Sequence, residues 1–177
     1  LMSQSLTWAD VEWVRSKWSG LLVVKGVMSA SEARAAVQAG ADAVGISNHG
    51  GRQLDGAPST ISVLPEIAEA VGGRAEIIFD SGIRRGADIV KALALGADAC
   101  MIGRAYLYGL AAGGAEGVRT AIRLLRDEID TIMALTGVNG VEELRRRGPE
   151  ILRTTGPGAR PAPARPAVRG VPAAKAG

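Results

Sequence analysis

Four short apolar runs, separated by helical patterns, constrain the fold of this chain more than any other feature. The runs lie at residues 21–25 (LLVVK), 43–47 (AVGIS), 76–80 (EIIFD) and 99–103 (ACMIG). They are too short for helices and do not alternate in polarity, which is typical of strands buried on both faces of a parallel sheet. Helical patterns at 31–39, 61–71 and 87–95 lie between them. This strand–helix order predicts an α/β fold with a parallel sheet.

The ends of two helices carry recognisable signals. Ser31 is the expected N-cap of the first helix, and Gly96 is the expected C′ glycine after the helix at 87–95. Beyond the fourth run we expect a short helical segment at 105–112 and a longer helix at about 116–135.

An internal repeat favours a barrel over an open sheet. Gly40-Ala41-Asp42 and Gly96-Ala97-Asp98 each link the end of a helix to the start of an apolar run. A repeated βα unit suits a (β/α)8 barrel, of which four strands are only half. Half a barrel leaves two unpaired edge strands and one uncovered sheet face. We therefore expect half of a barrel, in a truncated chain or one that needs a partner half.

The positive charge is concentrated at the C-terminal end. From Arg145 onward there are eight basic residues and one acidic residue, so the other 13 basic and 17 acidic residues give the body a net charge of −4. The body is therefore not expected to bind nucleic acid. Residues 1–155 are the expected folded domain, and residues 156–177, rich in Pro, Ala, Gly and Arg, are expected to be a disordered tail.

Cysteine content and hydropathy suggest the cellular compartment. The single cysteine, Cys100, excludes an internal disulfide and fits a reducing compartment. No apolar run approaches the roughly 20 residues of a membrane span, and the first residues do not resemble a signal peptide. We expect a cytoplasmic protein; contact between the basic tail and the inner membrane face is the alternative. Cys100 is expected in the core, and Trp8, Trp13 and Trp18 are expected to pack beneath the barrel.

Polar residues follow each apolar run at its carboxyl end. Lys25, Ser47, Asp80 and the pair Gly103-Arg104 occupy these positions. In a parallel barrel these ends share one face, where active sites are built. Gly82 and Gly103-Arg104 fit a phosphate site in the last two loops, although glycines that only form turns explain them equally well.

The segment SNHGGRQLDG contains the only histidine of the chain. His49 follows a strand end in a Gly-Gly loop, and Arg52 lies three residues later. A lone histidine is more often structural, but a neutral imidazole is a suitable base near neutral pH, and the arginine fork binds carboxylates through two hydrogen bonds. A base and a carboxylate anchor beside a phosphate-bearing cofactor indicate proton removal from a small organic acid.

Five segments together resemble one protein family: VVKG, SNHGGRQLDG, LPEI, DSGIRRGADIVKALALGA and IGRAYLYGL. They resemble the FMN-dependent α-hydroxy-acid dehydrogenases and oxidases, which include L-lactate dehydrogenases, glycolate oxidases and mandelate dehydrogenases. The resemblance extends from about residue 7 to residue 144. It implies FMN as cofactor, no metal, and oxidation of a 2-hydroxy acid, here L-lactate, to the 2-oxo acid.

The resemblance also implies a role for each matching residue. Lys25 would lie beside N1 and O2 of the flavin, and Ser47 would contact the flavin. His49 would be the catalytic base and Arg52 the substrate-carboxylate anchor. The residues that would line the ribityl chain and phosphate are Asp80, Ser81, Gly82, Ile83 and Arg84. Arg84 would also face the substrate. Gly103 and Arg104 would clamp the phosphate.

Departures from the family pattern limit what the chain can do alone. Family members usually have glycine where this chain has Ser81 and often proline where it has Ala105; neither residue is expected to have a side-chain role. The resemblance implies that this chain is the C-terminal half of the barrel, strands 5–8, and that the first four strands are missing, together with the carboxylate that orients the histidine. We therefore expect no turnover by the isolated chain. The full-length parent is expected to be a homo-oligomer, with oxygen, a quinone or a cytochrome as electron acceptor.

Two other functions remain open from the sequence. A flavin-dependent isomerase of isopentenyl diphosphate would keep the FMN barrel, but it needs no carboxylate anchor, so the pairing of His49 with Arg52 argues against it. A non-catalytic half-barrel that binds FMN or phosphate is the third possibility.

Overall fold

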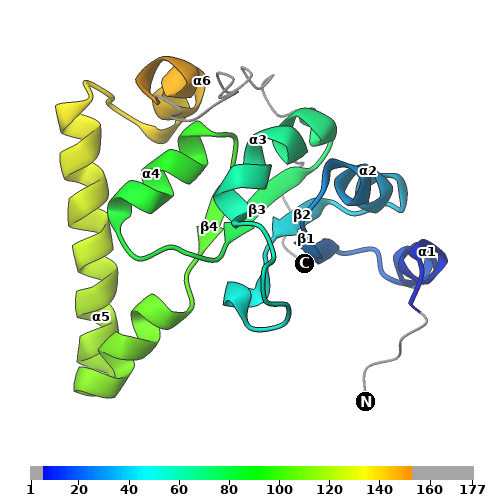
Figure 1. The fold of residues 1–177 in the computed structure, drawn as a ribbon, viewed down its shortest axis with the longest axis horizontal. Helices are drawn as coiled ribbons and strands as arrows, with labels where there is room; N and C mark the ends of the chain where they lie inside the picture. Colours follow the sequence, from blue (N-terminus) through cyan, green and yellow to red (C-terminus); the bar gives the residue numbers. More distant parts are fainter. Residues whose placement is uncertain (1–5, 153–177) are drawn as a thin grey trace.

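The computed structural model describes residues 6–152, which form a parallel four-stranded sheet with helices packed on one of its faces (Figure 1). In chain order, the elements are α1 (Trp8–Lys17), β1 (Val23–Val27), α2 (Ala30–Gln38), β2 (Ala43–Ile46), the 3-10 turn η1 (His49–Gly51), α3 (Thr60–Val71), β3 (Glu76–Asp80), α4 (Gly86–Ala94), β4 (Ala99–Met101), α5 (Arg104–Leu135) and α6 (Val141–Ile151). The predicted α/β class is confirmed. The predicted tail, 156–177, lies outside the described residues.

The sheet has the order β1-β2-β3-β4, with all neighbouring strands parallel. Its register places Lys25, Gly45, Ile78 and Ala99 in one row across the four strands. The pairing of β1 with β2 is irregular at Gly26, whose φ of +97° favours glycine. β1 begins two residues later than the sequence predicted, and β4 ends at Met101 instead of residue 103.

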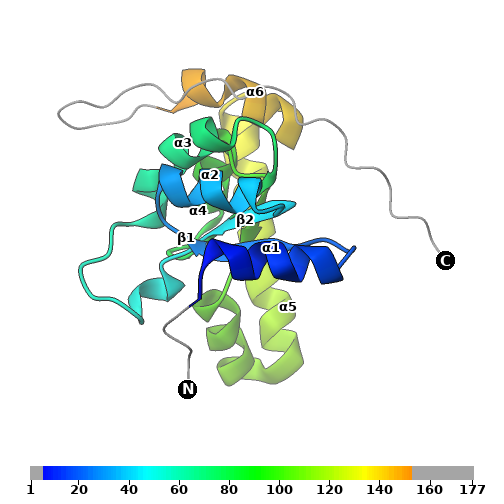
Figure 2. The same ribbon diagram turned by 90° about the vertical axis from the view of Figure 1, so that its right-hand side faces the viewer.

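The main core lies between the sheet and the helices that follow the strands. β2 is buried along its whole length, and Val44, Ile46, Ile77 and Phe79 pack against apolar residues of α2, α3 and α4. These helices lie along the same side of the sheet (Figure 2). Alternate residues of each strand therefore point into this core.

The opposite side of the sheet is uncovered by the described residues. We call it the open face and define it by Val23, Lys25, Ile78, Ala99 and Met101. Val23 is 45% exposed and Met101 is 37% exposed. β1 and β4 also keep one unpaired edge each within the described sheet. These are the two features that the sequence predicted for half a barrel.

The repeated Gly-Ala-Asp turns are structurally equivalent. The Asp42 N–H donates to Leu22 O over 2.9 Å, and its carboxylate accepts the Leu22 N–H over 2.8 Å. Asp98 makes the same pair of bonds with Ile77, over 2.8 Å and 2.7 Å. Each aspartate thus fastens the start of its own strand to the strand before it.

Helix ends differ from the sequence prediction at one cap. Ser29, not Ser31, caps α2, because the Ser29 hydroxyl accepts the Glu32 N–H over 3.2 Å. The predicted Gly96 signal after α4 is confirmed, with φ +112°. The separation of 105–112 from 116–135 is also confirmed, because α5 is interrupted by non-helical backbone at Gly113 and Gly114.

The expectation that the tryptophans pack beneath a barrel is wrong for this structure. α1 buries none of its residues, and Trp13 is 64% exposed. α1 lies against α2 at the edge of the helical layer, and its Arg15 bonds Asp42 at the start of β2. Cys100 is partly buried against the main core, where burial raises the pKa of its thiol to about 11 and keeps it protonated.

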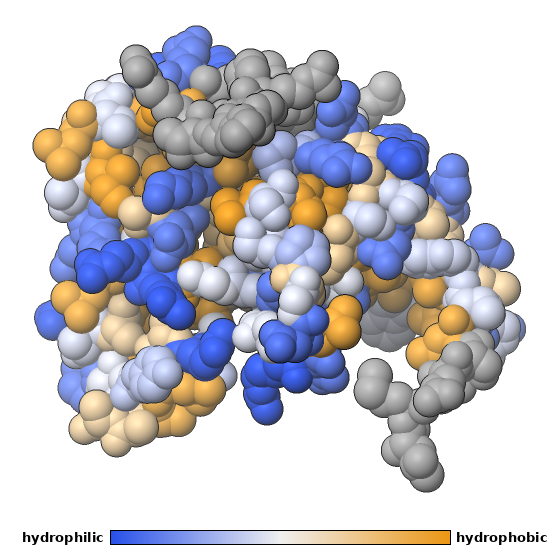
Figure 3. Space-filling model, viewed as in Figure 1, coloured by the Kyte–Doolittle hydropathy of each residue, from blue (hydrophilic) through white to orange (hydrophobic). Residues whose placement is uncertain are grey.

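α4 packs against both α5 and α6. A second apolar cluster, including Val90, Leu93, Val138 and Leu144, fills the space between these helices. The first half of α5 instead leaves Leu107 and Leu110 exposed, and Figure 3 shows apolar side chains gathered at that end of the molecule.

Candidate functional site

Three polar side chains converge at the carboxyl edge of the sheet: Lys25 reaches it from the middle of β1, Ser47 follows β2, and Asp80 ends β3. Lys25 Nζ lies 2.9 Å from Ser47 Oγ and 3.1 Å from Asp80 Oδ2. Ser47 donates to Asp80 Oδ1 over 3.0 Å and is only 1% exposed. The sequence predicted these residues at one edge of the sheet, and the structure joins them in one network.

Asp80 is ionised in this network. Burial of its carboxylate acts to raise its pKa. Hydrogen bonds from Ser81, Lys25 and Ser47, together with the charge of Lys25, outweigh burial and hold the pKa below the usual aspartate value. The network therefore contains a fixed negative charge next to a fixed positive one.

This shift predicts how stability depends on pH. Because the folded-state pKa of Asp80 is lowered, its ionised form stabilises the fold above the unfolded pKa of about 3.9. That contribution is lost as the pH falls through the lower folded-state pKa. We expect Asp80→Asn to lower the free energy of unfolding at pH 7, with a smaller difference from the wild type at pH 3, measured by urea unfolding. Asp55→Asn, which removes an exposed carboxylate, is the control. A difference independent of pH would contradict the prediction.

His49 begins a tight turn directly above the network. Its N–H donates to Ser47 Oγ over 3.1 Å, and its φ of +56° lies in the left-handed region. Its ring lies beside Gly26, where a Cβ would come within 3.2 Å of His49 Cε1. The side chain is exposed, and no hydrogen bond joins its imidazole to another described residue. The histidine that was predicted to be the base thus lies just past the end of β2, and no hydrogen bond from residues 6–152 orients its ring.

Asn48 holds the same turn from the other side. Its Oδ1 accepts the Gly51 N–H over 3.1 Å, and its Nδ2 donates to Pro58 O over 3.1 Å. No role was predicted for Asn48 from the sequence, although its position between Ser47 and His49 was a usable signal. Arg52 follows the turn with an exposed side chain, and the structure does not bring it into contact with the Lys25–Asp80 network.

Ser81 has a side-chain role, contrary to the sequence expectation. Its hydroxyl donates to Asp80 Oδ1 over 2.7 Å and accepts the Gly50 N–H over 3.1 Å. The expectation failed because a residue's hydrogen bonds across a turn depend on the backbone angles at that turn, which sequence spacing does not give.

The predicted phosphate residues lie in the loops after β3 and β4. A Cβ at Gly82 or Gly103 would meet nothing within 4 Å, so a ligand can approach the backbone closely there. α5 begins at Arg104 after Gly103, which provides no side-chain cap, so the first N–H groups of the helix are available to an anion. Arg84 is exposed, whereas the Ile83 side chain is buried in the main core, so only its backbone can face a ligand.

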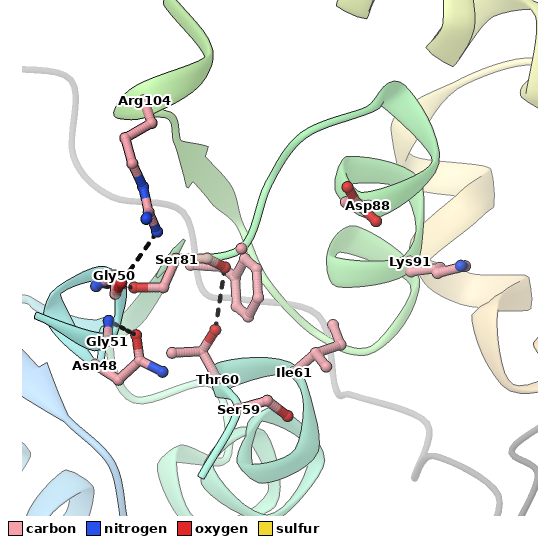
Figure 4. Close-up of a pocket in the computed structure, with 12 residues that line it drawn as sticks. Asn48, Gly50, Gly51, Ser59, Thr60, Ile61, Ser81, Asp88, Lys91 and Arg104 are labelled. Carbon is pink, nitrogen blue, oxygen red and sulfur yellow. Dashed lines mark hydrogen bonds between the residues drawn. The ribbon is translucent and has the colours of Figure 1, made fainter. Parts of the chain in front are cut away.

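Arg104 connects these loops to the histidine turn. Its Nη2 donates to Gly50 O over 3.0 Å (Figure 4). A pocket of about 340 Å³ lies between the histidine turn, the start of α3 and the start of α4. It is lined by Asn48, Gly50, Gly51, Ser59, Thr60, Ile61, Phe79, Ser81, Gly82, Asp88, Lys91 and Arg104.

The pocket and the charged network are separate parts of the site. The predicted residues Ser81, Gly82 and Arg104 line the pocket, but Lys25, His49, Arg52 and Asp80 do not. Figure 4 shows Thr60 donating to Ser81 O at the pocket wall, over 3.2 Å. The Lys25–Asp80 pair is instead part of the edge of the open face. The described residues contain no cluster of acidic, histidine or cysteine side chains that could hold a metal. No helix in this part of the chain combines the length and apolarity that a membrane crossing needs.

Comparisons with known proteins agree on one family. A sequence profile of the FMN-dependent dehydrogenases matches residues 1–152. L-lactate dehydrogenase of Xanthomonas campestris pv. campestris (strain B100) is 51% identical over 140 residues, which are 79% of this chain and 36% of that protein. L-lactate dehydrogenase of Vibrio cholerae serotype O1 (strain M66-2) is 49% identical over 142 residues, 80% of this chain and 38% of that protein.

A solved structure shows the same relation in three dimensions. Mandelate oxidase with (S)-2-phenylpropionate superposes with a TM-score of 0.77 at 47% identity, covering 80% of this chain and 42% of that one. The chain thus spans well under half the length of the relatives it matches.

Proposed function

Because this chain belongs to the family of FMN-dependent dehydrogenases, we propose that it carries the carboxyl-terminal half of a (β/α)8 barrel. The complete barrel oxidises a small 2-hydroxy acid, L-lactate, to the 2-oxo acid. One observation carries the proposal: the Lys25–Ser47–Asp80 network lies directly under the His49 turn, at the carboxyl edge of a parallel sheet. Barrel enzymes build their active sites at that edge.

The open face supports the half-barrel part of the proposal. A parallel sheet is stable when both faces are covered and its edges are paired. Here Val23 and Met101 remain exposed on the open face. β1 and β4 are the two edge strands, and each has one side that no described strand pairs with. Four further strands would pair both edges and cover this face. The relatives are more than twice as long as the part that this chain matches, which leaves room for such strands.

The residues present fit FMN. Lys25 offers a partly exposed ammonium group on the open face, suited to an electron-rich ring edge. The uncapped start of α5 and the unobstructed backbone at Gly82 and Gly103 suit a phosphate. Arg84 and Arg104 add positive charge nearby. When bound, FMN supplies the acceptor for the two electrons of the oxidation.

The chain's own residues then bind the substrate and move its proton. Arg52 binds the substrate carboxylate through its guanidinium fork, and Arg84 would add a second positive charge toward the substrate. His49 accepts a proton from the substrate at its imidazole. Asp80 stays ionised and holds the Lys25 ammonium group in place through their 3.1 Å ion pair. The His49 ring needs an orienting partner, which the other half of the barrel would provide.

Co-expression tests the proposal. The chain is expressed with the portion of the Xanthomonas campestris relative that precedes its match to this chain. We expect a complex with a flavin absorbance spectrum, and this flavin should bleach when L-lactate is added without oxygen. With the 177-residue chain alone, none of the 2-hydroxy acids should cause flavin bleaching.

Each failure has a distinct meaning. A complex without flavin would overturn the FMN site. A flavin-loaded complex that no 2-hydroxy acid bleaches would overturn the oxidation, and bleaching by mandelate or glycolate but not lactate would overturn the substrate assignment. Bleaching by the chain alone would overturn the need for a second half.

A further inference from the structure

Two non-glycine residues of the described chain have a positive φ, and both belong to this site. They are His49, at +56°, and Ser81, at +81°. Such a conformation costs a non-glycine residue of the order of 1 kcal/mol and persists only where surrounding contacts hold it. Ser81 stands at a turn that glycine would form without this cost.

The Ser81 contacts are what hold it there. Its hydroxyl bonds Asp80 Oδ1 over 2.7 Å and the Gly50 N–H over 3.1 Å, and its carbonyl accepts the Thr60 hydroxyl over 3.2 Å. Thr60 is almost completely buried, so this third bond ties the turn to the start of α3. Figure 4 shows Ser81 between Gly50 and Thr60.

Ser47 and Ser81 make the same type of connection. Each hydroxyl donates to Asp80 Oδ1, and each accepts a backbone N–H from the histidine turn: Ser47 from His49 and Ser81 from Gly50. The other oxygen, Oδ2, pairs with Lys25. One carboxylate thus holds two consecutive backbone groups of the turn on one side and a cation on the other.

We propose that Ser81 is a positioning residue, which fixes the turn carrying His49 by bridging the Gly50 N–H to the Asp80 carboxylate. This inference rests on the proposed role of His49 as the base. Ser81 itself touches no reacting group and acts only through the turn. The strained backbone persists because the serine hydroxyl, which glycine lacks, completes the bridge.

Two variants of Ser81 separate the effect of losing its hydroxyl from the effect of its strained backbone. Ser81→Ala removes the hydroxyl and keeps a side chain at φ +81°, whereas Ser81→Gly removes both the hydroxyl and the strain. Ser59→Ala is the matched control, because Ser59 lines the same pocket and its hydroxyl caps no helix N–H. Amide exchange of Gly50 by NMR in the 177-residue chain reports the turn directly. The ring signals of His49, the only histidine, report the base.

We expect Gly50 to exchange about two- to tenfold faster in both Ser81 variants, which is the usual range for one lost hydrogen bond. The His49 ring signals should shift in both variants, and Ser59→Ala should change neither readout. Ser81→Gly should unfold at a higher urea concentration than Ser81→Ala. Unchanged Gly50 exchange in the glycine variant would overturn the bridge.

Flavin reduction in the co-expressed complex tests the consequence for the base. Both variants should lower the rate at saturating L-lactate about two- to tenfold, with little change in KM because Arg52 is untouched. A wild-type rate in Ser81→Gly would overturn the positioning role. If the wild-type complex reduces no flavin, the proposed function fails, while the exchange data still decide whether Ser81 holds the turn.

Discussion

His49→Asn is expected to slow anaerobic FMN reduction by L-lactate about 10²- to 10⁴-fold in the co-expressed complex, which is the usual contribution of a positioned general base. Asparagine tolerates the left-handed region better than most residues, so it can keep the φ of +56° found at this position. The bond to Ser47 uses the backbone N–H and survives the substitution. The variant should therefore still bind FMN, which the flavin spectrum of the purified complex checks.

A control in the same loop separates loss of the base from disturbance of the turn. Gln53 is exposed just after Arg52, and Gln53→Ala should reduce flavin at the wild-type rate. A His49→Asn complex that reduces flavin at the wild-type rate would contradict the role of His49. A complex without flavin would instead show that the turn itself had changed, which the exchange of Gly50 would reveal.

The sheet and the position of the site could be predicted because they depend on local pattern. Short apolar runs mark the strands, and polar residues at their carboxyl ends must meet when the strands are parallel. Ser47 and Asp80 are separated by 33 residues, yet this rule brings them together, and the Lys25 side chain reaches both from the middle of β1. The repeated Gly-Ala-Asp turns were predictable for the same reason, because each repeats one local set of hydrogen bonds.

The contacts between loops could not be predicted in this way. Arg104 reaches Gly50 across 54 residues of sequence, and Ser81 reaches Gly50 across 31. Both bonds depend on backbone angles in turns, where one residue at positive φ redirects the chain. The Ile83 side chain also turns into the core instead of the ligand side. Such details depend on how the loops pack against one another in three dimensions, which the spacing of residues in the sequence does not give.

Gly148→Ser is expected to destabilise the chain by about 1–3 kcal/mol or more, the range for overpacking a close contact. Gly148 is buried in α6, where a Cβ would overlap the Ala94 carbonyl and lie 2.8 Å from Ala94 Cα. These are backbone atoms of α4, so they cannot move aside as a flexible side chain would. The two helices must separate to accept any side chain at this position.

Gly140→Ser on the same helix is the matched control. Gly140 is the N-cap of α6 with φ −172°, and a Cβ there meets nothing within 4 Å. Serine is a preferred N-cap, so this variant should match or exceed the wild type in urea unfolding. Equal unfolding midpoints for the two variants would contradict the close packing of α6 on α4.

Gly148→Ser should also weaken FMN binding. α4 begins at Gly86, directly after the loop that contains Gly82 and Arg84. A shift of α4 away from α6 would move this loop relative to the start of α5, and the proposed phosphate site lies between them. In the co-expressed complex, Gly148→Ser should therefore retain less flavin than Gly140→Ser, measured as flavin absorbance per protein. Equal flavin content despite lower stability would show that the phosphate loops do not depend on the position of α4.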